Sequence, residues 1–264
     1  MTAAPVAPGI PASDSSTAHP IGLSVFFPAY NDGGTIASMV IRSVQVAATL
    51  TTDYEVIVIN DGSSDSTAEI LNELARLYPD IVRIVQHEGN RGYGAALRTG
   101  FSTASKDLIF YTDGDAQYDP AEMKLLWARM DGNVDWVNGY KISRSDPPYR
   151  IVIGRVYHHL VKLLFGLKVR DVDCDFRLIR RRVFDVVRLD KSSGVICLEM
   201  MKKFHDAGFR VAEVPVHHFH RAYGRSQFFN FRRIFRTAID VIRLWWSLVV
   251  RKDHLKARGE TVAA

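Results

Sequence analysis

Short apolar runs alternate with amphipathic stretches along the chain from Ile21 onward. GLSVFF is followed by TIASMVIRSVQVAATL, YEVIVI by DSTAEILNELARLY, IVRIVQ by GYGAALRTGFSTA, and DLIFYT by DPAEMKLLWARM. A strand followed by a helix, repeated in this way, predicts an α/β fold. The apolar runs are too continuous for a sheet with one face in water, so we expect a mostly parallel sheet with helices on both faces. Ligands of such sheets bind beyond the carboxyl ends of the strands.

Two polar turns indicate helix starts within this pattern. Ser66 and Glu69 have the S-x-x-E spacing of a capping box, and Asp119 before Pro120 is typical of an N-cap followed by proline. After Val134 the alternation is less regular, with a strand VDWVNGY, a polar turn SRSDPPYR and an amphipathic stretch over 151–167.

The segment FRRIFRTAIDVIRLWWSLVVRK near the C-terminus has a different pattern. Polar residues recur at three- or four-residue spacing on an otherwise apolar stretch: Arg232, Arg236, Asp240, Arg243 and Ser247. This spacing predicts a strongly amphipathic helix. Such a helix could lie on an anionic membrane surface, with arginines at the headgroups and tryptophans at the boundary. The alternative is a helix docked on the core or against a second copy in a homo-oligomer.

Length, charge and cysteine content narrow the class of protein. At 264 residues, with 47% hydrophobic residues, the chain fits one globular domain with an appendage. The net charge of +5 favours anionic partners. Cys174 and Cys197 form no CxxC pair, which favours a reduced, cytoplasmic setting. The first 20 residues lack the basic and apolar regions of a signal peptide, so we expect a disordered tail there. No run of 18 apolar residues could span a bilayer.

The strongest chemical signal is the stretch TDGDAQ, which directly follows the apolar run DLIFY. Its carboxylates, Asp113 and Asp115, therefore lie at the carboxyl end of a predicted strand. Mg²⁺ and Mn²⁺ prefer oxygen ligands and commonly share them between carboxylates and substrate phosphates. Gln117 could add a third oxygen. An isolated D-x-D is more often a solvated turn, so the neighbouring strand ends decide its meaning.

Two further polar turns follow the first and second apolar runs. The first turn is Pro28-Ala29-Tyr30-Asn31-Asp32, and the second begins with Asn60-Asp61. Carboxylates at these points can accept hydrogen bonds from a base or a ribose, and Tyr30 can cover the face of a base. For Asp65, which follows in NDGSSDST, we expect a helix-capping role instead.

Together, PAYND, NDGSSDST, NRGYG and DGDAQ resemble in order the pattern of inverting glycosyltransferases with the GT-A fold, over about residues 23–226. KVRDVDCDFR, EVPV and RAYGRS narrow the resemblance to polyprenyl-phosphate sugar synthases of the dolichyl-phosphate mannose synthase type. The resemblance implies transfer of a sugar from GDP-mannose or a UDP-hexose to a polyprenyl phosphate, with Mg²⁺ or Mn²⁺ as cofactor. It also implies a GT-A domain over 21–226, between the tail (1–20) and a membrane-associated segment (227–264), peripheral on the cytoplasmic face of the cell membrane.

The resemblance further implies roles for individual residues. The nucleoside would contact Pro28, Tyr30, Asn31, Asp32, Asp61 and Asp113. The metal would be held by Asp113, Asp115 and Gln117, while Arg221 would bind the diphosphate or the acceptor phosphate. We expect the acceptor phosphate to be bound by Lys141, Arg155, Arg177 and Ser226. Arg155 shares a helical face with His159 and Lys162, a basic stripe that could steer a lipid phosphate. Asp32 stands where glutamate is usual, and Cys174-Asp175 where Ser-Gly is usual.

Other chemistries are consistent with the same residues. A hydroxyl acceptor would require a general base, which Asp171, Asp173, Asp175 or Glu199 could supply. A nucleotidyltransferase would also use a metal-bound carboxylate pair, but it would release pyrophosphate. A membrane-binding module without catalytic activity is the non-enzyme alternative. The chain has neither the G-x-G-x-x-G turn of dinucleotide-binding folds nor a G-x-x-x-x-G-K-[ST] loop. We expect no nucleic-acid partner.

Overall fold

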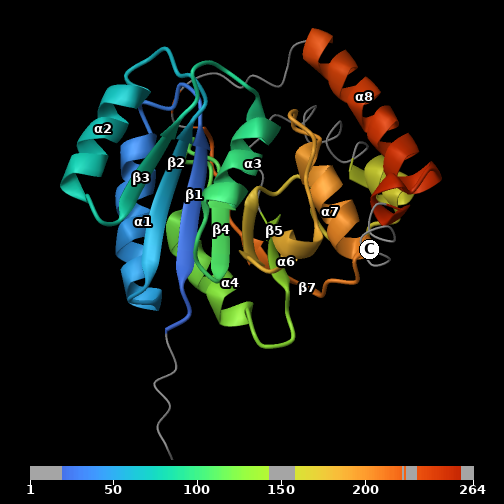
Figure 1. Cartoon of the computed structure of the whole chain (residues 1–264), viewed down its shortest axis with the longest axis horizontal. Coiled ribbons are helices and arrows are strands. Elements are labelled where there is room, and N and C mark those ends of the chain that lie inside the picture. The colour runs from blue at the N-terminus through green and yellow to red at the C-terminus, as the bar shows by residue number, and fades with distance from the viewer. Residues whose placement is uncertain (1–19, 143–157, 222, 224–230, 257–264) are drawn as a thin grey trace, which may run out of the picture.

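A computed structural model describes residues 20–142, 158–221, 223 and 231–256. Seven strands form one sheet in the order β3-β2-β1-β4-β6-β5-β7 (Figure 1). Their bounds are β1 Leu23–Ala29, β2 Tyr54–Asn60, β3 Val82–Gln86, β4 Leu108–Thr112, β5 Trp136–Lys141, β6 Phe176–Arg180 and β7 Val211–Val216. β6 runs antiparallel to β4 and β5, while the other pairings are parallel. The predicted mostly parallel α/β sheet is confirmed.

Helices cover both faces of this sheet, as the continuous apolar strands predict. They are α1 Ile36–Leu50, α2 Thr67–Leu77, α3 Tyr93–Thr103, α4 Met123–Arg129, α6 Val183–Val186, α7 Ile196–Asp206 and α8 Phe231–Trp245. Side chains alternate along β1: Phe26 belongs to a core shared with α3 and α7, and Phe27 to a core shared with α1 and α2. The sheet is therefore buried on both sides, and its ligand-binding edge is the carboxyl end of the strands.

Gly100 seats α3 closely on the sheet. A β-carbon at this position would lie 2.3 Å from the ring of Phe26, so only glycine allows the helix to approach β1 as it does. The start of α3, at Tyr93, is thereby held beside the end of β4, where the DGDAQ turn begins.

Both predicted helix starts are confirmed, but only one has the predicted side-chain cap. Asp119 accepts a hydrogen bond from the N–H of Ala121 (2.8 Å), and Pro120 opens a short 3₁₀ turn that leads into α4, as predicted. The capping box at Ser66 is wrong, because Ser66 makes no side-chain cap. Asp65 accepts from the N–H of Thr67 (3.0 Å) instead, so the expected capping role of Asp65 is confirmed.

The amphipathic helix α8 packs on the core by one face. Val241, Leu244 and Leu248 are buried in the same core as α7, and the Trp245 indole donates to the carbonyl of Leu164 (3.0 Å). Beyond α8, His254 lies 2.8 Å from Asp206 of α7. In Figure 1 the helix lies at the edge of the molecule next to α7. The docked alternative is therefore confirmed for this face.

Candidate active site

The turns that follow β1, β2 and β4 meet around one cavity at the carboxyl edge of the sheet. Its volume is about 550 Å³. The lining residues are Pro28, Ala29, Tyr30, Asp32, Asp61, Asn90, Gly92, Tyr93, Ala96, Asp113, Gly114, Asp115, Asp175, Ser192, Ser193, Gly194, Arg221, Arg236, Thr237 and Asp240. The structure thus brings together seven of the predicted site residues: Pro28, Tyr30, Asp32, Asp61, Asp113, Asp115 and Arg221.

Asp113 and Asp115 are fixed by neighbouring groups. The hydroxyl of Tyr93 donates to Asp113 Oδ1 (2.8 Å), and the N–H of Gln117 donates to Asp115 Oδ1 (3.0 Å). The guanidinium of Arg221 pairs with the other oxygen of Asp115. Ala116, which directly follows Asp115, takes a positive φ of 59° in this turn, and both carboxylates line the cavity.

The electrostatics of this pair fit a cation site. Burial raises the pKa of the Asp113 carboxyl well above its ordinary value, and the nearby Asp175 and Asp115 raise it further. Burial also raises the pKa of Asp115, against the lowering effect of Arg221. Buried acids that repel one another are stabilised by a shared divalent cation, and their oxygens are the ligands that Mg²⁺ and Mn²⁺ prefer.

The part of the cavity formed by the turns after β1 and β2 has two buried carboxylates with different partners. Burial raises the pKa of Asp32 to about 6, although the N–H of Tyr30 donates to its Oδ2 (3.0 Å). Asp61 lies 2.6 Å from His87 Nδ1 and accepts from the N–H groups of Arg91 and Gly92 (both 2.9 Å). Asp61 therefore both faces the cavity and fixes the loop after β3, whose Asn90 and Gly92 also line it.

Two predicted residues lie beside the cavity rather than in it. Asn31 adopts a positive φ of 57°, and its side-chain oxygen accepts from the N–H of Ser64 (2.8 Å), so it joins the turns after β1 and β2. Gln117 donates its side-chain N–H to the carbonyl of Phe219 (3.2 Å). Gln117 therefore ties the DGDAQ turn to the segment that carries Arg221.

The two predicted acceptor-phosphate residues that the structure describes, Lys141 and Arg177, do not line the cavity. Arg155 and Ser226 lie outside the described residues. Lys141 donates to the carbonyl of Asp173 (2.7 Å), and its ammonium lies 3.9 Å from Asp171, away from the lining residues. Of the predicted basic stripe, His159 and Lys162 lie on the described helical stretch 158–165.

Arg177 is buried beneath the cavity, with none of its surface exposed. It donates to Asn138 (2.9 Å), to the carbonyl of Val172 (2.9 Å), to Tyr111 and to Asp175 Oδ1 (3.0 Å). A guanidinium whose donors are taken up in this way cannot reach a substrate phosphate. The expected acceptor contact of Arg177 is therefore corrected: the residue supports Asp175, which does line the cavity.

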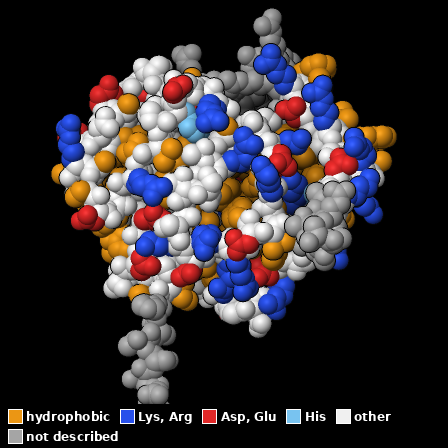
Figure 2. All heavy atoms as spheres, in the orientation of Figure 1, with side chains coloured by type: hydrophobic (Ala, Val, Ile, Leu, Met, Phe, Trp, Pro, Cys, Tyr) orange, Lys and Arg blue, Asp and Glu red, His pale blue; other side chains and the backbone are white. Residues whose placement is uncertain are grey.

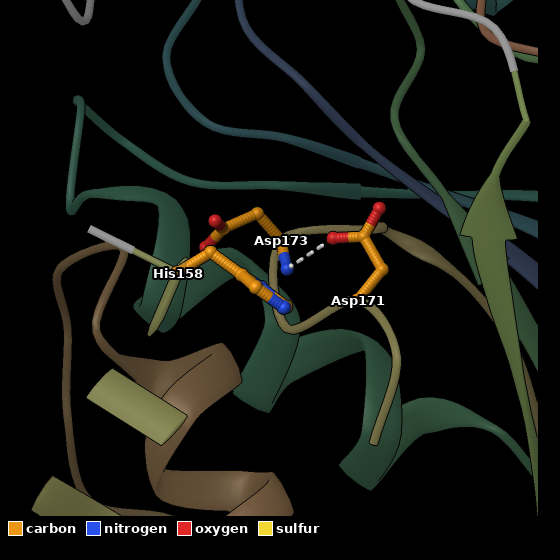
Figure 3. A group of neighbouring side chains, drawn as sticks. All are labelled: His158, Asp171 and Asp173. Atoms are coloured by element: carbon orange, nitrogen blue, oxygen red, sulfur yellow. Dashed lines mark hydrogen bonds between the residues drawn. The ribbon is translucent and has the colours of Figure 1, made fainter. Parts of the chain in front are cut away.

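The acidic segment 171–175 divides between two places. Asp171 and Asp173 lie next to His158, with ligand atoms within 4.8 Å of one another, and the N–H of Asp173 donates to Asp171 Oδ1 (3.0 Å), as Figure 3 shows. Burial raises the pKa of Asp173 to about 6. Neither residue lines the cavity, whereas Asp175 does. Among these three acids, only Asp175 is therefore placed to contact a substrate there.

Glu199, the other predicted base, is buried in α7. It pairs with Lys203 (2.7 Å) and accepts from the N–H groups of Asp190 and Lys191. Glu199 and Lys203 are four residues apart, so this is an ordinary ion pair on one helix face. Glu199 thus holds the loop that leads to Ser192 and Gly194 in the cavity wall.

Several lining residues have no individual role in the sequence-based prediction. Tyr93 lies in the NRGYG motif, and its contact with Asp113 depends on how α3 sits on the sheet. Ser193 belongs to none of the motifs named above. Its hydroxyl donates to Asp240 of α8 (2.9 Å). Arg236 belongs to the predicted amphipathic helix, but periodicity alone could not show that this helix borders the cavity.

The outer face of α8 is apolar and exposed. Exposed apolar side chains continue from α8 into the π-helical turn Trp246–Val250 that follows it: Phe235 (69%), Ile242 (64%), Trp246 (55%) and Val250 (45%). Leu160 and Leu163 are exposed in the adjoining helical stretch 158–165. In Figure 2 hydrophobic and basic side chains lie next to one another over this helix. Within the described parts of the chain, no helix has the length and apolar character needed to cross a bilayer.

Comparisons with known proteins agree with this architecture. Structures of glucosyl-3-phosphoglycerate synthase from Mycobacterium tuberculosis share the fold. Its complex with Mn²⁺, UDP and glucosyl-3-phosphoglycerate is 19% identical with a TM-score of 0.65, and its complex with Mg²⁺ and UDP is 20% identical with a TM-score of 0.63. Each match covers 86% of this chain and 79% of that one. The model of glycosyl transferase family 2 matches residues 24–188, more than half of the chain. The chain therefore belongs to glycosyl transferase family 2.

Proposed function

We propose that this glycosyltransferase moves a sugar, with inversion, from a nucleotide diphosphate sugar to a polyprenyl phosphate at the cytoplasmic face of a membrane. The observation that carries the proposal is the position of α8, which borders the cavity of Asp113 and Asp115 and presents an exposed apolar face on its outer side. A helix of this kind can lie at the boundary of a bilayer.

The donor would occupy the part of the cavity formed by the turns after β1, β2 and β4. Pro28, Tyr30, Asp32 and Asp61 line the nucleoside side, and Asp113 and Asp115 would hold Mg²⁺ or Mn²⁺ on the diphosphate. Bound there, the cation supplies neutralisation of the charge that develops on the leaving diphosphate. The similar synthase from M. tuberculosis binds UDP with Mn²⁺ or Mg²⁺. A UDP-hexose and GDP-mannose are both candidate donors.

The reaction requires little acid or base chemistry from the protein. An ionised phosphate oxygen of the acceptor attacks the anomeric carbon, a new C–O bond forms, and the bond to the diphosphate oxygen breaks with its electron pair on the departing nucleoside diphosphate. Arg221, held by Asp115, is placed to stabilise that charge. A hydroxyl acceptor would instead need a base, and Asp175 is the candidate because it lines the cavity.

The C-terminal segment would place the enzyme on the membrane. The apolar face of α8 includes Trp246, a residue type that favours the boundary between headgroups and acyl chains, and the exposed Arg251 and Lys252 follow it. Anionic headgroups complement these charges. In this arrangement the domain over 21–226 carries the donor site, and the segment over 227–264 carries the membrane contact.

The decisive experiment offers labelled UDP-glucose, UDP-N-acetylglucosamine and GDP-mannose to the purified protein with polyprenyl phosphate in detergent, with and without EDTA. Metal-dependent label in the organic phase, lost in Asp115→Asn, is the expected result. Release of pyrophosphate would indicate nucleotidyl transfer. Label confined to a water-soluble glycan product would overturn the lipid acceptor and direct attention to Asp175 as a base.

A further inference from the structure

The cavity has a second arginine that no catalytic group engages. Arg221 is already paired with Asp115. Arg236, on the first half of α8, also lines the cavity and is exposed. Within the described ranges, no hydrogen bond or ion pair ties up its guanidinium. Arg236 is therefore available for an anionic ligand.

The charges of the other lining residues restrict where in the cavity an anionic ligand can bind. Five of the lining acids lie on the side formed by the strand ends, and the sixth, Asp240, lies on α8 and accepts a hydrogen bond from Ser193; the five are Asp32, Asp61, Asp113, Asp115 and Asp175. A dianionic acceptor approaching the donor must be attracted on one side and kept away from these acids on the other. The hydrogen bond from Ser193 to Asp240, one turn after Arg236, ties α8 to the cavity wall, so Arg236 belongs to the part of the lining that α8 provides.

An apolar path leads away from this wall. Phe235 is next to Arg236 in sequence, and Ile242 and Trp246 follow it at the spacing of one helical face. Leu163, 82% exposed, belongs to the helical stretch whose Leu164 carbonyl accepts the Trp245 indole N–H. A lipid whose phosphate is bound at Arg236 could therefore lay its hydrocarbon chain along the outer face of α8.

We propose that Arg236 binds the phosphate monoester of the acceptor and orients it toward the donor, with the attached chain passing along the apolar face of α8. This inference deepens the proposed function and rests on it. The shared chemistry is a phosphate monoester, whether its source is a polyprenyl phosphate or a water-soluble phosphorylated acid such as the phosphoglyceric acid bound by the similar synthase.

The test compares Arg236→Gln, Arg236→Lys and the matched control Arg188→Gln. Arg188 is 95% exposed and does not line the cavity, so it reports the loss of one positive charge alone. KM is measured separately for the donor and for two acceptors, polyprenyl phosphate in detergent and 3-phosphoglycerate. UDP affinity, measured by calorimetry, confirms that each variant is folded and binds nucleotide.

We expect Arg236→Gln to raise the acceptor KM about tenfold or more, the effect of one charge-assisted hydrogen bond, while the donor KM changes less than about twofold. Arg236→Lys should recover part of the loss, and Arg188→Gln should match the wild type. An unchanged acceptor KM in Arg236→Gln, or equal increases for donor and acceptor, would overturn the role of Arg236. Wild-type transfer to 3-phosphoglycerate but not to the lipid, with the same Arg236 effect, would keep this role and overturn the proposed lipid acceptor.

Discussion

Replacing Asp61 by asparagine would test how the end of β2 fixes the loop after β3 at the cavity. Asp61 is buried, and three donors converge on its carboxylate: His87 Nδ1 and the N–H groups of Arg91 and Gly92. The other ring nitrogen of His87 lies 3.0 Å from the hydroxyl of Thr99 in α3. One carboxylate therefore joins a strand end, a loop and a helix.

The expected loss follows from counting donors and acceptors. Asparagine keeps one acceptor oxygen and replaces the other with an NH₂ group, which must face one of the three donors. A hydrogen bond to a charged group is worth about 1.5–3 kcal/mol, and an unsatisfied buried donor costs about 1–3 kcal/mol more. We therefore expect Asp61→Asn to lower the free energy of unfolding by about 3–5 kcal/mol. UDP affinity should also fall, because Gly92 lines the cavity.

Urea denaturation followed by circular dichroism measures the first effect, and calorimetric titration with UDP measures the second. Asp80→Asn is the matched control, since the same chemical change at an exposed residue should alter stability by less than about 0.5 kcal/mol. A loss below about 1 kcal/mol in Asp61→Asn, with full UDP affinity, would refute the account of Asp61 as the group that organises this loop.

Three further predictions concern the metal site, α8 and acid stability. Tyr93→Phe removes the hydroxyl from Asp113 and should raise the Mn²⁺ concentration for half-activation by about three- to tenfold at unchanged Tm; an unaltered metal requirement would contradict this. Leu244→Ala should cost about 2–5 kcal/mol in urea unfolding, whereas Ile242→Ala should spare stability and weaken vesicle binding, so the reverse pattern would contradict the orientation of α8. Although burial opposes it, cationic partners hold the pKa of Asp206 below its ordinary value; the stability this provides is present above the unfolded pKa and is lost as pH falls through the folded value. The Tm deficit of Asp206→Asn should thus shrink from about pH 6 to pH 3, and a constant deficit would contradict the assignment.

The first half of the chain could be predicted well from its sequence because local signals agree there. Continuous apolar runs, each ended by a polar turn, place Pro28, Asp61 and Asp113 at neighbouring strand ends, and parallel strands bring those ends together. The capping-box hydrogen bond of Ser66 is absent, and Asp65, one residue earlier, accepts from the N–H of Thr67 at this helix start.

The side-chain contacts in the second half of the chain could not be predicted as well, because they join segments that are distant in sequence. Arg177 is in a basic-looking segment, yet its place on β6 faces it inward toward Tyr111 and Asn138. The alternation of side chains along a short strand does not predict that a charged residue such as Arg177 faces the interior. Similarly, a helical period identifies the two faces of α8, but only tertiary packing shows that Arg236 reaches the cavity.

The buried pair of Arg177 and Asp175 limits how this enzyme can change during evolution. Arg177 is fully enclosed, and Asp175 Oδ1 accepts from it and from the thiol of Cys197. Loss of Asp175 alone leaves the enclosed Arg177 charge without its carboxylate partner, which is strongly destabilising, whereas replacement of both residues can be tolerated. A new acceptor preference that requires a different residue at position 175 would therefore have to pass through a double substitution, so we expect the two positions to covary among relatives.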